Sequence, residues 1–521
     1  MSDAAVLSQN PYNSGLIPEI SQNPYTQSRD PYPSTPTQYS GPLSLGEWSI
    51  FVNNGLWAPR DFDLVIIELL EKALQGKVSR ILLSVPSRHG KSTLISRNLA
   101  SYFLAHYPND KVILSAYSQG LASEFGGQVK DIINHYGYLS KYNVKLSNDS
   151  RAKNKFNLDG YHGQMLAVGA AGSIMGFGAG LFIVDDPIKN VADAESEVKQ
   201  QKLQDWFQGV VKSRLERRTN KKPPIIIVIA QRLHLNDLHG IIKTTEPTID
   251  AITAYEILRN GGSIPNDTWV DLNIPAICVE PEKDILGRKL NEVLWEEQRD
   301  YDWLTAEKRA MGSYLFNAIY QGMPVEREGN IFKRHWFMDE TTNTIYNQLT
   351  PEEIPSDLPK LRYWDFGASG KKGDATAGML TGWDGEFLYM LNLVTGNLTA
   401  NQVLRTFERT AKRDGKTVKI RVEQEPGASS KLLINKFRHN RKFKGYNIRG
   451  DKVRYKKNVR SFDLEALAEA GCIYWLKGDW NIKVIDHLVA FIGQEGKKDD
   501  IADSCTGSAR FWRKPKSKVN A

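Results

Sequence analysis

Short apolar runs alternate with amphipathic stretches from Leu56 onward, a pattern that predicts an α/β protein. Four of the runs have no polar interruption, which is typical of parallel strands buried on both faces. These runs are Ile81–Leu83, Val112–Leu114, Leu181–Val184 and Ile225–Ala230. Amphipathic segments such as Leu94–Phe103 and Val198–Leu215 separate them and predict helices. Helices on both faces of a parallel sheet are typical of a nucleotide-binding fold.

A second α/β unit is predicted after a less regular stretch. Strands are expected at Leu361–Asp365, Phe387–Leu393 and Val418–Val422, and a last helix is expected to start near Asp500. The predicted organisation is a first core at residues 43–240, a linker and accessory subdomain at 241–355, a second core at 356–510 and a basic tail at 511–521.

The first 42 residues have a different composition. They hold seven of the 23 prolines, almost no charge, and a repeated unit at Asn10–Tyr12, Asn23–Tyr25 and Asp30–Tyr32. Such a segment has little apolar surface to bury, so we expect it to be disordered. A tether is the simpler interpretation, and docking of a partner through the Pro-Tyr units is the alternative.

The bulk composition excludes several classes of protein. At 521 residues the chain is long enough for about two to four domains, and 41% apolar with 25% charged residues is typical of a folded, soluble protein. No run approaches about 18 apolar residues and no signal peptide is apparent, so a membrane protein is not expected. Cys278, Cys472 and Cys505 lack metal-binding or disulfide spacing and favour a reducing cytoplasm.

The first predicted strand runs into a loop and then a helix, the context that a phosphate-binding loop requires. The segment is Val85, Pro86, Ser87, Arg88, His89, Gly90, Lys91, Ser92 and Thr93. Residues Ser87 to Thr93 are expected to bind a nucleotide. Backbone N–H groups cradle its phosphates, Lys91 supplies a positive charge, and the Ser92 hydroxyl ligates Mg²⁺. Val85 replaces the usual first glycine, which weakens the match by pattern alone.

Polar residues follow two further predicted strands. Asp185 and Asp186 close one of them; Asp185 is expected to hold Mg²⁺ through water and Asp186 to polarise the attacking water. Because Pro187 follows, capping of the next helix is the alternative. Gln231 and Arg232 close the other strand, where Gln231 is expected to sense hydrolysis at the γ-phosphate.

The second unit carries acidic residues at three places. Asp365 ends one predicted strand, Glu423 follows another, and Asp499, Asp500 and Asp503 mark the start of the last helix. Carboxylates from two strands and a helix can converge on two divalent ions about 4 Å apart and cleave a phosphodiester. Because carboxylates repel one another, such a site needs its metals. The alternatives are a helix-terminal role for Asp499 and Asp500 and an exposed loop position for Glu423.

Positive charge is concentrated in one segment. Between Lys431 and Arg460 there are twelve Lys or Arg and one acid, a net charge of +11, whereas the rest of the chain sums to −3. Beside the predicted metal site, such a surface is expected to bind duplex DNA through its phosphates. A solvated loop is the alternative. Four aromatic residues are expected to anchor the segment to the core rather than to stack on bases: Phe437, Phe443, Tyr446 and Tyr455.

In their order along the chain, from about residue 50 to 510, these motifs resemble the large terminase subunits of tailed bacteriophages. The loop Val85–Thr93 is similar to the family's phosphate loop, which carries an arginine. Further similar stretches in the first half are Gly169–Gly180, Asp185–Lys189, Gln231–His234 with Asp237, and Phe316–Pro324. In the second half they are Trp364–Gly367, Gly373–Thr376, Val422–Gly427 and Asp499–Asp503.

The resemblance implies an N-terminal RecA/ASCE-type P-loop ATPase domain and a C-terminal ribonuclease H-like nuclease domain. It implies that Arg88 acts as a sensor or trigger at the γ-phosphate and that Gln231 couples hydrolysis to movement. One departure is Asp186, where many relatives carry Glu. The residues expected to act in catalysis are Arg88, Lys91, Asp186, Gln231, Asp365, Glu423 and Asp500.

The sequence alone does not decide between several candidate metal ligands of the second unit. Either Asp499 or Asp500 is the helix ligand, with Asp503 as the weaker candidate. Glu425 competes with Glu423 for the position after the second strand. By resemblance, Asp374 is also expected near the metals.

The implied activity is ATP-powered translocation of double-stranded DNA into a procapsid, with metal-dependent cleavage of concatemeric DNA. The implied cofactors are ATP and Mg²⁺, with Mn²⁺ as an alternative at the nuclease site. Implied partners are double-stranded DNA, the portal protein of the procapsid, a small terminase subunit, and further copies of the chain in a pentamer. The host cell cytoplasm is the expected location, rather than a membrane or the mature virion.

Two other functions fit parts of the pattern. A cellular helicase or repair ATPase with a fused nuclease domain is one, but helicases carry a second RecA-like domain where this chain has an irregular stretch. A DNA-binding assembly protein whose ATP site only switches conformation is the other. Such a protein has no need of Asp365, Glu423 and Asp500 together.

Overall fold

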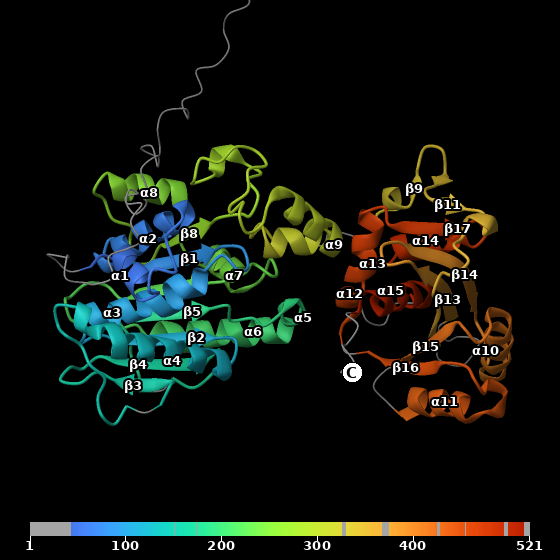
Figure 1. Cartoon of the computed structure of the whole chain (residues 1–521), viewed down its shortest axis with the longest axis horizontal. Coiled ribbons are helices and arrows are strands. Elements are labelled where there is room, and N and C mark those ends of the chain that lie inside the picture. The colour runs from blue at the N-terminus through green and yellow to red at the C-terminus, as the bar shows by residue number, and fades with distance from the viewer. Residues whose placement is uncertain are drawn as a thin grey trace, which may run out of the picture. The chain divides into compact units, whose positions relative to one another are not determined.

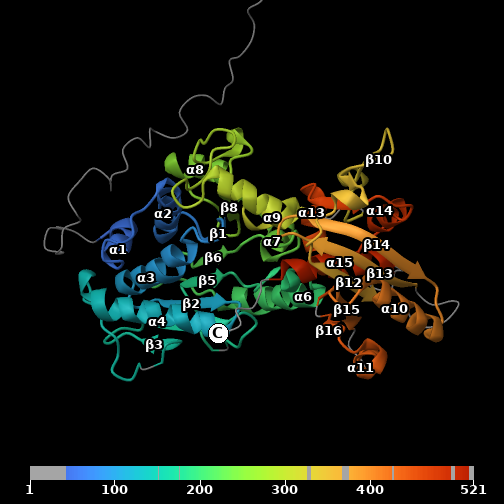
Figure 2. The same ribbon diagram turned by 45° about the vertical axis from the view of Figure 1, so that its right-hand side comes forward.

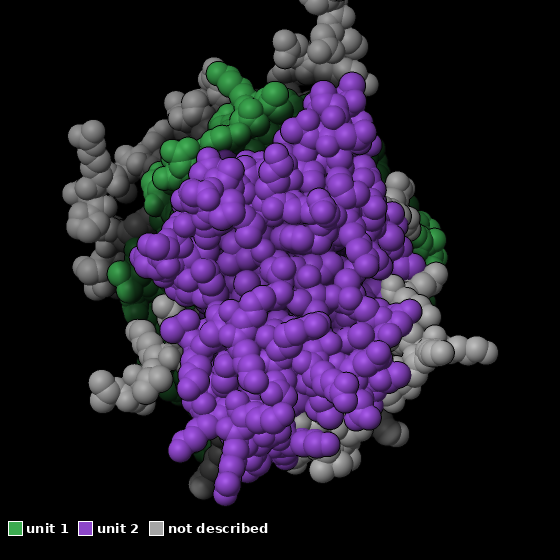
Figure 3. Space-filling view, turned by 90° about the vertical axis from the view of Figure 1, so that its right-hand side faces the viewer, with its two compact units in different colours: residues 1–304, 317–325 green, residues 305–316, 326–521 purple. Residues whose placement is uncertain are grey.

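The computed structural model describes residues 43–150, 152–174, 176–325, 330–366, 375–424, 428–453, 455–493 and 499–514. The Pro-Tyr repeats, Gly367, Asp374, Glu425 and residues 515–521 of the basic tail lie outside these ranges. The chain divides into two compact units (Figures 1 and 3). Unit 1 holds residues 1–304 and 317–325, and unit 2 holds residues 305–316 and 326–521. Within the described ranges, no helix has the length and apolar character to cross a bilayer.

Unit 1 is built on an eight-stranded sheet with the order β3-β4-β2-β5-β6-β1-β8-β7. Its strands are β1 (Arg80–Ser84), β2 (Lys111–Ala116), β3 (Lys155–Asn157), β4 (Gln164–Gly169), β5 (Leu181–Asp185), β6 (Ile225–Ile229), β7 (Thr248–Asp250) and β8 (Trp269–Asn273). Only β3 pairs antiparallel to its neighbour among these strands. The four predicted parallel strands are confirmed as β1, β2, β5 and β6.

Helices cover both faces of this sheet, which is why the central strands carry apolar residues at every position. They are α1 (Leu45–Phe51), α2 (Asp61–Leu74), α3 (Ala100–His106), α4 (Gln119–Tyr136), α5 (Val191–Ala194), α6 (Glu197–Trp206), α7 (Leu238–Thr245) and α8 (Ala251–Arg259). Side chains of α1 to α4 and α8 share one apolar cluster with Ile81 and Leu83 of β1. Those of α6 and α7 share another with Leu82.

The interpretation of residues 241–355 as a linker and accessory subdomain needs correction. Strands β7 and β8 belong to the first sheet, where β8 lies directly beside β1. Asp271 interrupts the apolar run of β8, so the segment lacked the signature of a buried strand. Helix α9 (Tyr301–Ile319) is broken at Gly312, whose φ and ψ are 81° and 157°, and its residues 305–316 belong to unit 2.

Unit 2 contains a seven-stranded sheet with the order β11-β17-β14-β13-β12-β15-β16. Its strands are β11 (Gln348–Leu349), β12 (Lys360–Asp365), β13 (Thr376–Trp383), β14 (Leu388–Gly396), β15 (Lys419–Gln424), β16 (Ile448–Lys452) and β17 (Ile473–Leu476). Strands β12, β13 and β14 form an antiparallel meander, whereas β15 and β16 run parallel to β12. A short hairpin of β9 (Met338–Asp339) and β10 (Thr344–Ile345) precedes the sheet.

Helices also lie on both faces of the second sheet (Figure 2). They are α10 (Ala400–Asp414), α11 (Ala428–His439), α12 (Lys457–Arg460), α13 (Phe462–Glu469), α14 (Asn481–Val489) and α15 (Asp500–Arg513). Phe407 of α10 and Phe437 of α11 pack with Trp364 and Val422 in one apolar cluster. Residues of α13, α14 and α15 pack with Ala377 and Met379 in another.

Both predicted limits of the second core are too narrow. The core begins before residue 356, because β11 pairs with β17. It also extends beyond residue 510, because α15 continues to Arg513. The first strand is only two residues long, and the basic end of α15 resembles a tail in sequence, so neither carried a clear signal.

Candidate active sites

The phosphate loop joins β1 to a π-helical segment, Thr93–Leu99, that continues into α3. Arg88 and Gly90 have positive φ values of 66° and 81°. The positive φ of residue 90 favours glycine there, and a Cβ would approach Nη2 of Arg60 to 3.3 Å. The loop therefore ends where a helix begins, the position at which backbone N–H groups bind phosphate.

Lys91 forms an ion pair with Asp186 at the carboxyl edge of the sheet. Nζ of Lys91 lies 3.2 Å from Oδ1 and 3.1 Å from Oδ2 of Asp186, and the lysine side chain is only 6% exposed. Oδ1 of Asp186 also accepts a hydrogen bond of 2.8 Å from the backbone N–H of Gln231. The structure thus brings together predicted site residues that follow β1, β5 and β6.

Asp185 is fully buried beside this pair. Its Oδ2 accepts a hydrogen bond of 2.6 Å from the hydroxyl of Ser96, whereas its Oδ1 is buried without a partner among the described residues. Burial, followed by repulsion from Asp186, raises the pKa of Asp185 to about 6. A buried oxygen without a partner, in a carboxyl group that the Ser92 hydroxyl also contacts, fits a hard cation such as Mg²⁺.

Ser96 is a site residue that the sequence interpretation missed. It lies four positions after Ser92, and that spacing places both hydroxyls on one side of a helix, so the signal was available.

We expect Ser96→Ala to lower the free energy of unfolding of unit 1 by about 1–3 kcal/mol, because a buried carboxylate oxygen of Asp185 loses its donor. Urea titration measures this change. The control is Ser123→Ala on α4, because the Ser123 hydroxyl accepts a hydrogen bond from the exposed Gln119. An equal loss of unfolding free energy in both variants contradicts the proposed role of Ser96.

His89 takes a position that the motif did not indicate. It is buried, and its Nδ1 donates to the carbonyl oxygen of Ser87 at 3.0 Å. Its ring lies 5.9 Å from that of Phe62 and 5.8 Å from that of Trp295. Burial, with the cations Arg299, Arg60 and Lys91, lowers the pKa of His89 to about 4. His89 is therefore neutral near pH 7, and its ring supports the loop without adding a positive charge to it.

Arg88, by contrast, is exposed and makes no hydrogen bond or ion pair with any residue that the structure describes. Arg232, which follows Gln231, is buried and pairs with Asp237 at 3.0 Å. Asp237 in turn caps α7 by accepting from the N–H of Gly240. Of the two arginines, only Arg88 is thus free to reach a ligand.

In unit 2, the predicted carboxylates converge at one end of the sheet. Strands β12 and β15 are parallel neighbours with Trp364 opposite Val422, so Asp365 and Glu423 leave the sheet at the same edge. Asp365 is half-buried at the end of β12, and burial together with repulsion from Glu423, Asp503 and Asp500 holds its pKa well above the usual range. The strand and helix acids thus lie close enough to repel one another.

The helix acids are held by specific contacts. Oδ2 of Asp500 accepts from the backbone N–H of Ala375 at 3.0 Å. Burial, followed by repulsion from Asp503, raises the pKa of Asp499 to about 7. Asp503 is 2% exposed and lies between Glu423 and Asp499 in the network of contacts. Asp503 was expected to be the weaker candidate, but it takes a central place because it lies one helical turn after Asp499 and so returns to the same face.

Two basic side chains that the sequence interpretation assigned to a DNA-binding surface complete the cluster. Arg460 donates from Nη1 to Oε1 of Glu423 at 2.6 Å and from Nη2 to Oδ1 of Asp503 at 3.2 Å. Nζ of Lys457 lies 2.7 Å from Oδ2 of Asp503 and also contacts Asp499. Lys457 and Arg460 therefore belong to the acid cluster rather than to an exposed patch.

The cluster fits a divalent cation in its chemistry. All of its candidate ligands are carboxylate oxygens, and Oε2 of Glu423 is buried without a partner among the described residues. Within the same ranges, however, no three acidic, His or Cys side chains are already arranged as ligands of one ion. Lys457 and Arg460 bind the carboxylate oxygens that a metal would use.

The described residues of the basic segment form helices, a strand and a turn rather than one loop. They are α11, a short 3-10 turn at Arg441–Phe443, β16 and α12. Phe437 and Phe443 are buried in the core, which confirms their predicted anchoring, and Tyr446 packs against them. Tyr455 is 51% exposed, so the anchoring prediction is wrong for this residue. It lies just before α12, and it belongs to none of the apolar clusters of the described residues.

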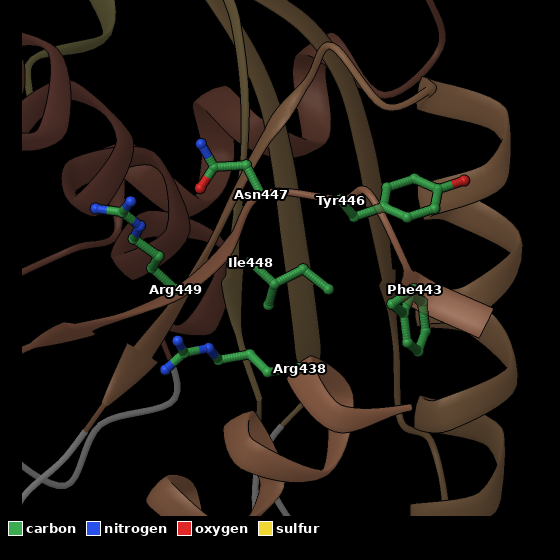
Figure 4. Close-up of a pocket in the computed structure, with 6 residues that line it drawn as sticks. All are labelled: Arg438, Phe443, Tyr446, Asn447, Ile448 and Arg449. Atoms are coloured by element: carbon green, nitrogen blue, oxygen red, sulfur yellow. The ribbon is translucent and has the colours of Figure 1, made fainter. Parts of the chain in front are cut away.

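A cavity of about 310 Å³ opens in this segment. Its lining residues come from the end of α11, the 3-10 turn and β16, and they are Arg438, Phe443, Tyr446, Asn447, Ile448 and Arg449 (Figure 4). Figure 4 shows Arg438 and Arg449 directed to the same side, away from Phe443 and Tyr446. Both arginines are exposed. The arrangement presents two guanidinium groups, neither ion-paired with a described residue, over one hollow.

A P-loop sheet in one unit and a sheet that gathers carboxylates in the other define a two-unit ATPase and nuclease. Two family models match the chain, and both describe one family. "Terminase large subunit, T4likevirus-type, N-terminal" matches residues 82–206, and "Terminase RNaseH-like domain" matches residues 362–508. The chain belongs to the large terminase subunits, the DNA-packaging ATPase–nucleases of tailed bacteriophages, and the helicase alternative is not favoured.

Solved structures of phage terminases are similar to the chain at low sequence identity. The large terminase of a thermophilic bacteriophage is 10% identical, with 87% of this chain and 98% of that chain covered and a TM-score of 0.48. The HK97 bacteriophage large terminase is 14% identical, with 90% and 99% covered and a TM-score of 0.34. The large terminase nuclease from thermophilic phage G20c, with bound magnesium, is 12% identical, with 36% and 98% covered and a TM-score of 0.26. Comparison with curated proteins gave no match.

Proposed function

We propose that unit 1 binds and hydrolyses ATP at the edge where β1, β5 and β6 end. The observation that supports this most is the contact of Lys91 with Asp186 beside Asp185, whose Oδ1 has no partner among the described residues. Backbone N–H groups of Ser87–Thr93 bind the phosphates, and Lys91 exchanges its pair with Asp186 for a phosphate oxygen. Ser92 and Asp185 hold Mg²⁺, which neutralises charge on the phosphates.

Release of Lys91 frees Asp186 for a second role. Its carboxylate is then available to orient the attacking water, although its side chain is shorter than the Glu of many relatives. Gln231 is tied to Asp186 through its backbone N–H, so a change at Asp186 reaches the segment after β6. That connection supports Gln231 as the residue that couples hydrolysis to movement. Arg88 supplies an exposed positive charge for the γ-phosphate.

We further propose that unit 2 cleaves duplex DNA with Asp365, Glu423 and the acids of α15. Asp365, Glu423, Asp499, Asp500 and Asp503 are the candidate ligands of Mg²⁺ or Mn²⁺. Such ions supply an activated water and stabilise the leaving oxygen of the phosphodiester. The chain's own contribution is to gather carboxylates from two adjacent strands and one helix into a buried cluster, against their mutual repulsion.

The partners follow from this function. Double-stranded DNA is the substrate, and the portal protein of a procapsid, a small terminase subunit and further copies of this chain in a pentamer are the proposed assembly. The host cell cytoplasm is the proposed place of action. ATP turnover stimulated by procapsids tests the proposal. Turnover stimulated only by single-stranded DNA contradicts it and favours a helicase.

The cavity at β16 is the proposed contact with the DNA backbone. We expect Arg438→Gln with Arg449→Gln to weaken binding of duplex DNA on the order of tenfold at low salt, because two guanidinium contacts to phosphate are lost. The slope of log K against log salt concentration should fall by about 2. Fluorescence anisotropy of a labelled duplex at several salt concentrations measures both quantities.

Arg405→Gln on α10 is the matched control, since this arginine is exposed in the same unit and does not line the cavity. It removes the same kind of charge from a different place. A comparable loss of affinity per charge in the control would mean that net charge alone attracts DNA. Unchanged binding in the double variant rules out the cavity as a DNA contact.

A further inference from the structure

Helix α12 directs two basic side chains into the acid cluster. Lys457 and Arg460 are three residues apart, so they share one face of the helical turn. Together they contact Glu423, Asp499 and Asp503. Both oxygens of Asp503 are engaged, Oδ1 by Arg460 and Oδ2 by Lys457. This face of α12 is therefore built to fit the carboxylates, not to meet solvent.

The two cations differ in how firmly they are held. The side chain of Arg460 is 4% exposed, and its planar fork joins two carboxylates from β15 and α15. The side chain of Lys457 is 15% exposed and ends in a single point charge on a flexible stem. Lys457 can thus leave by rotation of its own side chain, whereas Arg460 would have to break its contacts with both Glu423 and Asp503, which lie on different elements.

The charge of the cluster explains what the cations do. Asp365, Glu423, Asp499, Asp500 and Asp503 carry five negative charges when all are ionised, and Lys457 and Arg460 form ion pairs with three of them, Glu423, Asp499 and Asp503. These seven side chains by themselves sum to −3. Without compensation, buried carboxylates repel one another and disperse or take up protons. Lys457 and Arg460 reduce that repulsion. The same positive charges oppose the approach of a divalent cation, because like charges at short range repel in a buried site.

We propose that α12 is a cationic latch on the nuclease site, with Lys457 as the releasable part and Arg460 as the fixed part. The latch rests on the nuclease function proposed above. Lys457 holds Asp499 and Asp503 before metal binds, and a divalent cation takes these oxygens only when Lys457 has withdrawn. Arg460 is a positioning residue that keeps Glu423 and Asp503 at the spacing the site needs. The chain thereby has a low affinity for metal, which restrains cleavage.

Metal titration of the full chain without DNA tests the latch. We expect Lys457→Gln to bind Mn²⁺ at least about tenfold more tightly than the unsubstituted chain, since one opposing charge is removed and two carboxylates are released. Arg460→Gln is expected to do the opposite, with weaker Mn²⁺ binding and a lower melting temperature in EDTA. Electron paramagnetic resonance of free Mn²⁺ gives the affinities. Adding Asp365→Asn to Lys457→Gln should abolish the tight binding, which assigns it to this site.

Lys483→Gln in the exposed face of α14 is the charge-matched control and should leave Mn²⁺ binding unchanged. Unchanged or weaker binding by Lys457→Gln overturns the latch, as does tighter binding by the control to the same extent. A separate assay of DNA cleavage with Mn²⁺ distinguishes this failure from failure of the proposed function. If the unsubstituted chain cleaves DNA and Lys457→Gln binds Mn²⁺ with unchanged affinity, only the latch is refuted. Tight binding by Lys457→Gln without any cleavage refutes only the nuclease function.

Discussion

Lys91→Ala is expected to reduce ATP hydrolysis by about 10²-fold or more and to abolish packaging, while Mn²⁺-dependent DNA cleavage remains in part. The ammonium group of Lys91 is the buried positive charge of the phosphate loop, and removal of one preorganised charge contact typically costs this much. The ion pairs of Glu423, Asp499 and Asp503 with described residues lie within unit 2. Phosphate release from ATP and cleavage of linear duplex DNA are measured on the same preparation.

The control for this variant is Lys145→Ala, which removes an exposed lysine from another part of unit 1. Loss of the Lys91 charge also leaves Asp186 without its ion-pair partner, so thermal unfolding should be recorded for both variants. ATP hydrolysis at the unsubstituted rate in a folded Lys91→Ala chain would show that this loop does not serve a nucleotide. Loss of DNA cleavage to the same extent would contradict the division into two sites.

Asp365→Asn should have the reverse effect, with DNA cleavage reduced by about 10³-fold and ATP hydrolysis retained. Replacement of a carboxylate by an amide removes a metal ligand while it keeps the size of the side chain, and the ions account for several kcal/mol of transition-state stabilisation. Cleavage of supercoiled DNA with Mg²⁺ or Mn²⁺ measures the first quantity, and phosphate release measures the second. Cleavage at the unsubstituted rate would remove Asp365 from the site.

The stability of Asp365→Asn separates lost chemistry from lost folding. Burial and the neighbouring carboxylates hold the pKa of Asp365 well above its usual range, so the folded chain keeps this proton to higher pH than the unfolded chain does. Stability is therefore lost as pH rises above the unfolded pKa of about 4. Asn does not titrate and avoids this loss. In EDTA at about pH 8, the variant should melt no lower than the unsubstituted chain, and a lower melting temperature would point to misfolding instead.

The two proposed centres differ in how their charged side chains are paired. In unit 1, Lys91 and Asp186 form a single ion pair beside one fully buried acid, Asp185. In unit 2, Arg460 and Lys457 form ion pairs with three carboxylates, those of Glu423, Asp499 and Asp503. A bound nucleotide brings negative charge to the first centre, whereas a bound metal brings positive charge to the second. In each, a lysine that is paired within the chain has to change its partner.

Contiguous patterns predicted much of this molecule. The uninterrupted apolar runs became β1, β2, β5 and β6, because a strand covered on both faces needs apolar residues at every position. The phosphate loop, Asp185–Asp186 and Gln231 met at one edge, because parallel strands of one sheet present their carboxyl ends together. Asp365 and Glu423 became neighbours for the same reason.

Only the tertiary structure decided the remaining features. Three features depend on where distant segments pack. They are the placement of β8 beside β1, the hydrogen bond from Ser96 to Asp185, and the insertion of Lys457 and Arg460 among the carboxylates. A local pattern shows whether a residue favours burial, but it does not name the partner that burial brings. Arg460 therefore looked like part of a DNA-binding surface in the sequence. Its contact with Glu423, 37 positions away, exists only because β15, α12 and α15 converge in the folded unit.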